Sequence, residues 1–231
     1  MIPGYRLITP NLGEFFWNET ISNELLRYQL AIKTQVLGDF GDKIQETRIG
    51  FQTLSIVWKS GIPISEINSW LESMPTKLIL KSLSEDCWKV PVRYSSSTGR
   101  DLETLAETKN FTVSELISLH SSVEYRIHFF GFLPGFMYLN GLPEQLHAPR
   151  KRIPDLSVPA GSVAIGGSQT GIYPSESPGG WHLIGRSPIR LFDPNLIPAV
   201  WAKPGEKLLF TPISEKEFDL LIRHPKLPEL R

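Results

Sequence analysis

The sequence has little cysteine, no excess charge of either sign and no long hydrophobic run. Cys87 is the single cysteine among 231 residues, which excludes an internal disulfide and a cysteine-rich metal site and suits a reducing compartment. The 24 basic residues balance 24 acidic residues. No overall field therefore exists to attract nucleic acid or an anionic membrane, and we expect neither as a partner.

Signals for export or membrane insertion are also missing. The most apolar stretch, residues 127–139, is shorter than a membrane span and is interrupted by Gly131, Pro134 and Gly135. The opening residues, MIPGYRLITPNLGEFFW, lack the basic start and the unbroken apolar run of a signal peptide. The five histidines show no metal-ligand spacing. We expect a cytoplasmic protein without a bound metal.

Strand and helix patterns alternate in the first part of the chain. Residues 21–36 carry apolar side chains at helical spacing, with Thr20 or Ser22 as the N-cap and an end at Gly38. A second helix follows at residues 64–74 and is closed by Pro75.

A last apolar strand, CWKVPVRYS (87–95), completes the order strand-helix-strand-strand-helix-strand. That order is typical of the ferredoxin-like split βαβ arrangement. Pro91 within this strand indicates an edge position or a bulge, because proline lacks a backbone donor.

The second part of the chain changes from helices to short strands. Two short helices are expected within residues 100–122, the second opened by a capping box of Thr112 and Glu115. From residue 123 onward, short strands alternate with glycine and proline turns, which is typical of a closed or sandwiched β structure. We therefore predict an α+β protein with two domains, 1–86 and 87–231.

One motif resembles a nucleotide-binding loop without meeting its requirements. GWHLIGRS (180–187) has the glycine spacing of a Walker A loop, but Arg186 replaces the lysine. Such a loop must lead from a strand into a helix, whereas Pro188 follows here and the sequence continues as strand. We interpret the motif as a strand. The basic segment PRKR (149–152) is interpreted as a solvated loop.

Several polar and aromatic side chains allow a structural or a functional role. Arg186 lies on an apolar strand, and if it points inward it requires an anion, either an acidic side chain or a ligand. His120 ends the second short helix, where an imidazolium interacts with the last carbonyls, and we prefer this capping role. Gln169 either binds a polar ligand or satisfies turn backbone groups. Tyr173 and Trp181 are more often core residues than site residues.

Glycine- and proline-rich blocks carry a resemblance to a known family. They are GFLPGF (131–136), VPAGSV (158–163), QTGIYP (169–174), PGGWHLIGR (178–186) and LFDP (191–194). Together they resemble the allophanate hydrolase subunit 1 family, also called the carboxyltransferase C/D-domain or Kip-inhibitor family. That family includes a component of the bacterial ATP-dependent 5-oxoprolinase, a sporulation kinase inhibitor and a portion of urea carboxylase.

The resemblance implies a fold and an activity. The implied fold is a ferredoxin-like α/β domain followed by a cyclophilin-like β-barrel, with residues 171–188 in the wall of a pocket. The implied activity is that of an ATP-dependent amidohydrolase, which opens the lactam of 5-oxo-L-proline to L-glutamate. ATP is then a co-substrate, and the partners are subunits A and C of 5-oxoprolinase, the latter having a related barrel.

The resemblance also implies a set of substrate-binding residues for a small amide or lactam. They are Arg150, Gln169, Tyr173, His182 and Arg186. No catalytic residue is assigned. The chain departs from the family at Pro154-Asp155, where many relatives repeat proline-arginine, and at His182, where glutamine is often expected.

Two alternative functions remain open. One is an interaction protein that binds a sensor histidine kinase and blocks its autophosphorylation, which requires an exposed apolar surface but no catalytic residue. The other is a component of a urea- or allophanate-processing enzyme. Partnership with subunits A and C distinguishes the 5-oxoprolinase component from a kinase inhibitor.

Overall fold

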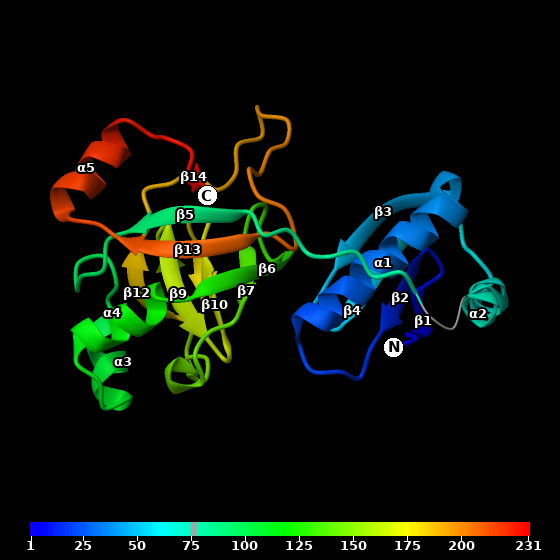
Figure 1. Cartoon of the computed structure of the whole chain (residues 1–231), viewed down its shortest axis with the longest axis horizontal. Helices are drawn as coiled ribbons and strands as arrows, with labels where there is room; N and C mark the ends of the chain where they lie inside the picture. Colours follow the sequence, from blue (N-terminus) through cyan, green and yellow to red (C-terminus); the bar gives the residue numbers. More distant parts are fainter. Residues whose placement is uncertain (75–77) are drawn as a thin grey trace. The chain divides into compact units, whose positions relative to one another are not determined.

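The computed structural model describes residues 1–74 and 78–231 and divides the chain into two compact units (Figure 1). The first is Met1–Leu83 and the second is Ser84–Arg231. Each unit contains its own β-sheet. Pro75, the expected end of the second helix, lies outside the described residues. In the part of the chain that is described, no helix is long and apolar enough to cross a membrane.

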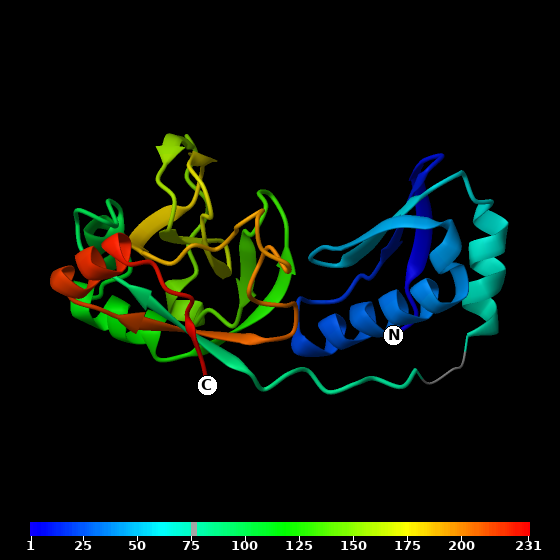
Figure 2. The ribbon, with the colours of Figure 1, turned by 90° about the horizontal axis from the view of Figure 1, so that it is seen from above.

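The first unit is a four-stranded antiparallel sheet with two α-helices. The strand order is β1-β2-β4-β3, and α1 runs along one face of the sheet (Figure 2). The elements are β1 (Gly4–Thr9), β2 (Leu12–Phe16), α1 (Asn23–Phe40), the 3-10 turn η1 (Gly41–Lys43), β3 (Ile44–Ile49), β4 (Thr53–Trp58) and α2 (Ile64–Ser73).

Local sequence signals position α1. Ser22 is the N-cap, and its hydroxyl accepts a hydrogen bond from the Leu25 amide at 3.1 Å. The apolar stripe predicted for this helix is buried against the sheet. The helix ends at Phe40 rather than at Gly38, because a solvent-facing glycine weakens a helix without ending it.

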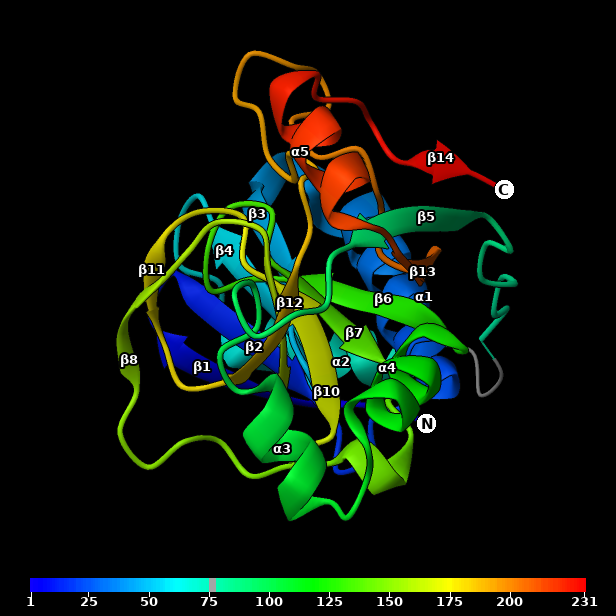
Figure 3. The same cartoon turned by 90° about the vertical axis from the view of Figure 1, so that its left-hand side faces the viewer.

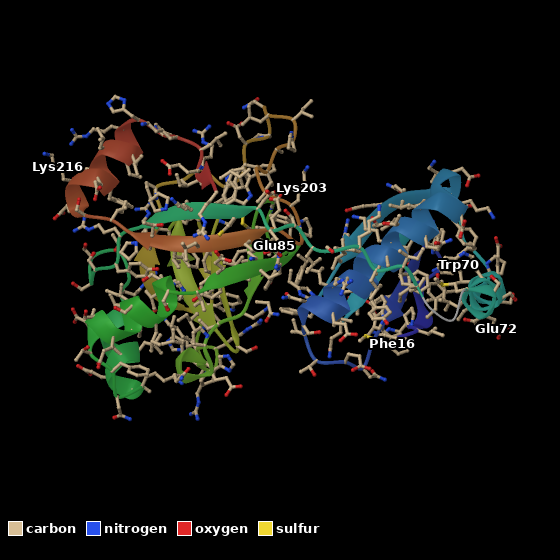
Figure 4. All side chains as sticks on the ribbon, viewed as in Figure 1. Phe16, Trp70, Glu72, Glu85, Lys203 and Lys216 are labelled. Carbon is tan, nitrogen blue, oxygen red and sulfur yellow. The ribbon has the colours of Figure 1, made fainter. Side chains whose placement is uncertain are left out.

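Trp70 packs α2 against the rest of the first unit. The indole of Trp70, which is labelled in Figure 4, contacts the rings of Phe15 and Phe40, with centroids 5.9 and 5.7 Å away. Its Nε1 donates to Asp39 at 2.7 Å. The burial of these rings supplies much of the apolar area that a small unit needs for stability.

The strand β5 (Cys87–Val92) corrects the predicted order of the first domain. It belongs to the second unit, where it pairs with β13 in parallel and with β14 in antiparallel orientation. In the first sheet, β1 lies beside β2, in the place that a split βαβ arrangement gives to its last strand. The predicted ferredoxin-like order is therefore wrong in that strand, because an apolar pattern does not reveal which sheet a strand joins.

The second unit holds the remaining elements. They are β5 (Cys87–Val92), α3 (Leu102–Thr108), α4 (Val113–Ser121), β6 (Glu124–Phe130), β7 (Met137–Asn140), η2 (Glu144–Leu146), β8 (Asp155–Val158), β9 (Ser162–Gly166), β10 (Gln169–Ile172), β11 (Ser177–Gly179), β12 (His182–Arg186), β13 (Lys207–Pro212), α5 (Glu215–Arg223) and β14 (Glu229–Leu230). The larger sheet has the order β12-β9-β10-β7-β6-β13-β5-β14. The pair β8 and β11 lies to one side of it (Figure 3).

The larger sheet curls without forming the closed barrel that the sequence predicted. One bridge, with paired backbone hydrogen bonds of 2.9 Å, joins Arg93 at the end of β5 to Arg186 in β12. Pairing stops there because the chain turns at Ser95, whose carbonyl accepts from the Thr98 and Gly99 amides. Among the described residues, β12 and β14 remain the ends of the strand ladder.

Pro91 lies at a local edge, as predicted. It is opposite Thr211 on β13, whereas β14 pairs only with Trp88 and Lys89 on the other side of β5. A proline at this position costs no ladder hydrogen bond, because no strand is present to accept one.

His120 is a core residue and not the helix-capping cation that we predicted. Its ring is fully buried and stacks on Phe210 at 4.6 Å. Thr170 Oγ1 donates its only proton to the Ala164 carbonyl, so it accepts from His120 Nε2 at 2.9 Å. Nδ1 then accepts from the Tyr94 hydroxyl at 2.8 Å. Burial lowers the pKa of His120 to about 3, which keeps the ring neutral.

The capping box of α4 is confirmed and leads to a stability prediction. The Thr112 hydroxyl accepts from the Glu115 amide at 3.2 Å, while the Glu115 carboxylate accepts from the Thr112 amide at 2.7 Å. Thr112→Ala is expected to lower the free energy of unfolding by about 1 kcal/mol. Urea denaturation measures this loss, and Thr104→Ala, an exposed change on α3, is the control and should stay within about 0.5 kcal/mol of the parent.

Candidate functional site

Three of the predicted site residues share one face of the larger sheet. Thr170 and Ile172 of β10 point into the core, so Gln169 and Gly171 point to the opposite face. Tyr173 and Arg186 join this outer face, because both lie opposite Ser162 on β9. Strand alternation alone therefore brings Gln169, Tyr173 and Arg186 to the same side of the sheet.

A cluster of aromatic rings covers this face. Phe136 lies at its centre, with ring centroids 4.8 Å from Tyr138, 5.2 Å from Tyr173 and 5.7 Å from Trp181. The exposed Phe132 contacts Phe136 at 5.6 Å. We name Phe132, Phe136, Tyr138, Tyr173 and Trp181 the aromatic cluster. Tyr173 and Trp181 are thus core residues, as their residue types favoured.

Two glycines allow the indole of Trp181 to lie flat on the sheet. A Cβ at Gly166 would come within 2.5 Å of the indole ring, and one at Gly171 within 3.2 Å. Any side chain at Gly166 would therefore displace the ring. This close approach explains why glycine-rich blocks stand beside aromatic residues in the sequence.

Gln169 offers a hydrogen-bond donor that the described residues leave unused. The side chain is 5% exposed, and its Nε2 has no hydrogen-bond partner in the described part of the chain. It lies opposite Gly166, beside the Trp181 indole. An unpaired buried amide costs free energy, and a ligand with a carbonyl or carboxylate oxygen removes that cost.

Arg150 provides the positive charge of the site. Its guanidinium lies 5.8 Å from the centre of the Trp181 ring, and the side chain is exposed. Burial raises the pKa of Tyr173 to about 12, and the nearby Arg150 opposes this rise. Burial also raises the pKa of Tyr138, again against the effect of Arg150. Both phenols therefore remain protonated near neutral pH.

His182 acts on the loop that carries Arg150. Its Nε2 donates to the Pro149 carbonyl at 2.9 Å. Two residues further, the Lys151 amide donates to the Gly180 carbonyl at 2.7 Å. These two bonds fix the peptide groups on both sides of Arg150. The structure thus gives His182 a role in holding the loop.

Arg186 stands apart from this group of residues. Its Nε donates to the Ala160 carbonyl at 2.7 Å, and the side chain is half-buried. No carboxylate pairs with it among the described residues. The sequence left two anions open as the partner of Arg186, an acidic side chain or a ligand, and the described residues supply no acidic side chain. The guanidinium nitrogens other than Nε are therefore free for a ligand.

The basic segment 149–152 is more ordered than the solvated loop we predicted. Lys151 is only 16% exposed and forms ion pairs with Asp101 at 2.7 Å and Asp155 at 2.8 Å. Arg152 is exposed, as predicted. The sequence contains a signal for the buried ion pair of Lys151. Asp155 follows four residues later, at the position where many relatives were expected to carry arginine.

A hollow of about 250 Å³ opens on the α3 side of Arg150. It is lined by Arg150 and His182, by residues at and just after α3, namely Thr104, Leu105, Thr108 and Lys109, and by Ala148 and Pro149, which precede Arg150. Its lining contains two basic side chains, Lys109 and Arg150, and no carboxylate. Arg150 therefore lies between the aromatic cluster and this hollow.

The motif at 180–187 is a strand, as predicted. His182–Arg186 form β12, and Ser187 bonds through its amide to the Gly161 carbonyl at 2.8 Å. Residues 187–206, all of them described, contain no helix that would direct its N-terminus at a phosphate. In the described part of the chain, no group of histidine, cysteine and acidic residues is arranged to hold a metal ion.

Comparison with known proteins then places the chain. Residues 13–202 match the family described as the carboxyltransferase domain, subdomain C and D. The chain belongs to this family. A protein of Escherichia coli, named as the B subunit of 5-oxoprolinase, is 49% identical over 127 residues, which cover 55% of this chain and 58% of that protein.

A second relative and a solved structure extend the comparison. The B subunit of the Haemophilus influenzae 5-oxoprolinase is 38% identical over 167 residues, 72% of this chain and 78% of that protein. The urea carboxylase of Kluyveromyces lactis has a TM-score of 0.81 at 16% identity, covering 98% of this chain and 23% of that protein, which shows a shared fold. The family member from E. coli is matched over little more than half its length.

Proposed function

We propose that this carboxyltransferase-family chain is the B subunit of an ATP-dependent 5-oxoprolinase, which opens 5-oxo-L-proline to L-glutamate in complex with subunits A and C. The observation that carries the proposal is the name shared by its relatives. The H. influenzae relative bears it with a match over 78% of its length, and the E. coli relative bears it at 49% identity. The kinase-inhibitor alternative has no comparable support.

Three features of this chain support the proposed substrate. 5-Oxo-L-proline is a small ring with a lactam carbonyl at one end and a carboxylate at the other. The unpaired Nε2 of Gln169 is a donor for the lactam oxygen, and the exposed guanidinium of Arg150 is a bidentate partner for the carboxylate. Phe132, the exposed ring of the aromatic cluster, is the apolar surface that this chain offers to the ring carbons.

The role proposed for this chain is binding and orientation. An amide is resonance-stabilised, and hydrolysis of ATP by the complex supplies the free energy for opening it. The described residues contain no phosphate-binding loop, so we assign the ATP site to the partner subunits. The Nε2 of Gln169 is the donor that we assign to the lactam.

We also propose a fold class for each of the two units. We assign the second unit to an open form of the cyclophilin-like barrel class, supported by the bridge from Arg93 to Arg186 that joins the end of β5 to β12. We assign the first unit to a permuted ferredoxin-like arrangement, in which β1 replaces the last strand.

Reconstitution tests the function directly. This chain is co-expressed with subunits A and C, and ATP hydrolysis is measured with and without 5-oxo-L-proline. We expect the substrate to stimulate ATP hydrolysis and L-glutamate to form, and both effects to vanish when this chain is omitted. A folded, co-purifying complex that shows no stimulation would reject the assignment.

A further inference from the structure

Arg150 is exposed, yet the backbone around it is fixed. The Pro149 carbonyl accepts from His182, and the Lys151 amide donates to Gly180. Residues 149–151 therefore run beside residues 180–182, which sets Arg150 opposite Trp181. A mobile loop would not hold a guanidinium at one place over a ring.

The Lys151 side chain joins this loop to two other segments. Its ammonium lies 2.7 Å from Asp101 and 2.8 Å from Asp155, and all three side chains are at least 79% buried. Asp101 precedes α3, and its carboxylate also accepts from the Leu183 amide in β12 at 2.8 Å. One cation thus connects the start of α3, the strand β12 and the loop that carries Arg150.

The two carboxylates depend on the cation between them. Both approach the same ammonium, so its removal would leave Asp101 and Asp155 facing each other without their nearest positive charge. Asp101 accepts from the Leu183 amide of β12, whereas Asp155 is the first residue of β8, directly after the loop that carries Arg150. Arg100 is a second cation near Asp155, but at 3.9 Å and with a more exposed side chain. The loop is therefore the part expected to move.

We propose that Lys151 is a positioning residue that holds Arg150 over Trp181 and thereby sets the affinity of the site for a carboxylate ligand. The choice of 5-oxo-L-proline as that ligand rests on the proposed function. A guanidinium placed before the ligand arrives loses less conformational entropy on binding. In the described part of the chain the Lys151 ammonium pairs with Asp101 and Asp155, so its proposed effect on the ligand acts through the position of the loop.

The kinetic test uses the complex with subunits A and C. For Lys151→Met we expect the KM for 5-oxo-L-proline to rise about 10-fold while kcat stays within about 2-fold. Lys151→Arg keeps the cation and should restore most of the affinity. Arg152→Met removes a neighbouring charge without an ion pair among the described residues and should leave KM unchanged. An unchanged KM in the Lys151→Met complex would overturn the proposal.

Hydrogen exchange on the full chain separates this proposal from the assigned reaction. In Lys151→Met, the amides of residues 151 and 183 should exchange at least about 10-fold faster than in the parent, while the protection of the amides in α4 is kept. Unchanged exchange at these amides would overturn the positioning role. If the parent complex does not turn over 5-oxo-L-proline at all, the proposed function fails, and the exchange rates still decide the role of Lys151.

Discussion

Replacement of Arg150 by methionine is expected to raise the KM of the complex for 5-oxo-L-proline by about 10- to 100-fold. That range corresponds to the loss of charge-assisted hydrogen bonds worth about 1.5–3 kcal/mol. Arg150 is exposed and pairs with no carboxylate in the described part of the chain, so the variant removes a ligand contact without leaving a buried acid unpaired. Steady-state ATP hydrolysis at varied substrate concentration measures the change.

The matched control for Arg150→Met is Arg152→Met, two residues away on the same loop. Arg152 is equally charged and exposed, so a general effect of loop charge would alter both variants alike. Equal KM values for the two variants would show that the guanidinium of Arg150 does not bind the substrate carboxylate. Thermal unfolding of each variant confirms that the comparison is made between folded proteins.

The second large effect concerns stability and the buried His120. His120→Ala is expected to lower the free energy of unfolding by about 3–5 kcal/mol at neutral pH, because it creates a cavity beside Phe210 and leaves the Tyr94 hydroxyl without its partner. Chemical denaturation measures the loss. Tyr94→Phe removes only the hydroxyl and should cost about 1–2 kcal/mol. A loss below that of Tyr94→Phe would contradict the proposed network.

The effect of His120→Ala should also depend on pH. The pKa of His120 is lowered to about 3 in the folded protein, against an ordinary value of 6.5. Between these values the unfolded chain binds a proton that the folded chain does not, so the parent loses stability as the pH falls, by about 1.4 kcal/mol per unit. The variant lacks this titration. The difference between parent and variant should therefore shrink by about 2 kcal/mol from pH 7.5 to pH 5.

Local signals in the sequence were sufficient for several elements of the fold. The capping box at Thr112 and the strand character of residues 182–186 follow from residues that are neighbours in the chain, and the structure confirms both. The assignment of β5 failed because its partners, β13 and β14, lie more than a hundred residues away. The predicted capping role of His120 was wrong for the same reason, since its hydrogen-bond partners Tyr94 and Thr170 are distant in sequence.

In the candidate site, too, local sequence predicts some features, whereas others depend on residues that are distant in the chain. Strand alternation explains why Gln169, Tyr173 and Arg186 share a face. The position of Arg150 over Trp181 depends on a loop-to-strand contact that no sequence period encodes. That the Gln169 amide lacks a hydrogen-bond partner becomes visible only when the side chains of several neighbouring strands have been placed around it.

The pairing of β5 has a consequence for how the chain is made. β5 begins the second unit, yet its two neighbours in the sheet are β13 and β14, at residues 207–212 and 229–230. During synthesis, the first unit can close once Leu83 has left the ribosome, whereas β5 must wait for strands translated more than a hundred residues later. The apolar side of β5 then lacks its partner strands while residues 93–212 are translated. We expect this interval, rather than the first unit, to determine how much nascent chain is lost to aggregation.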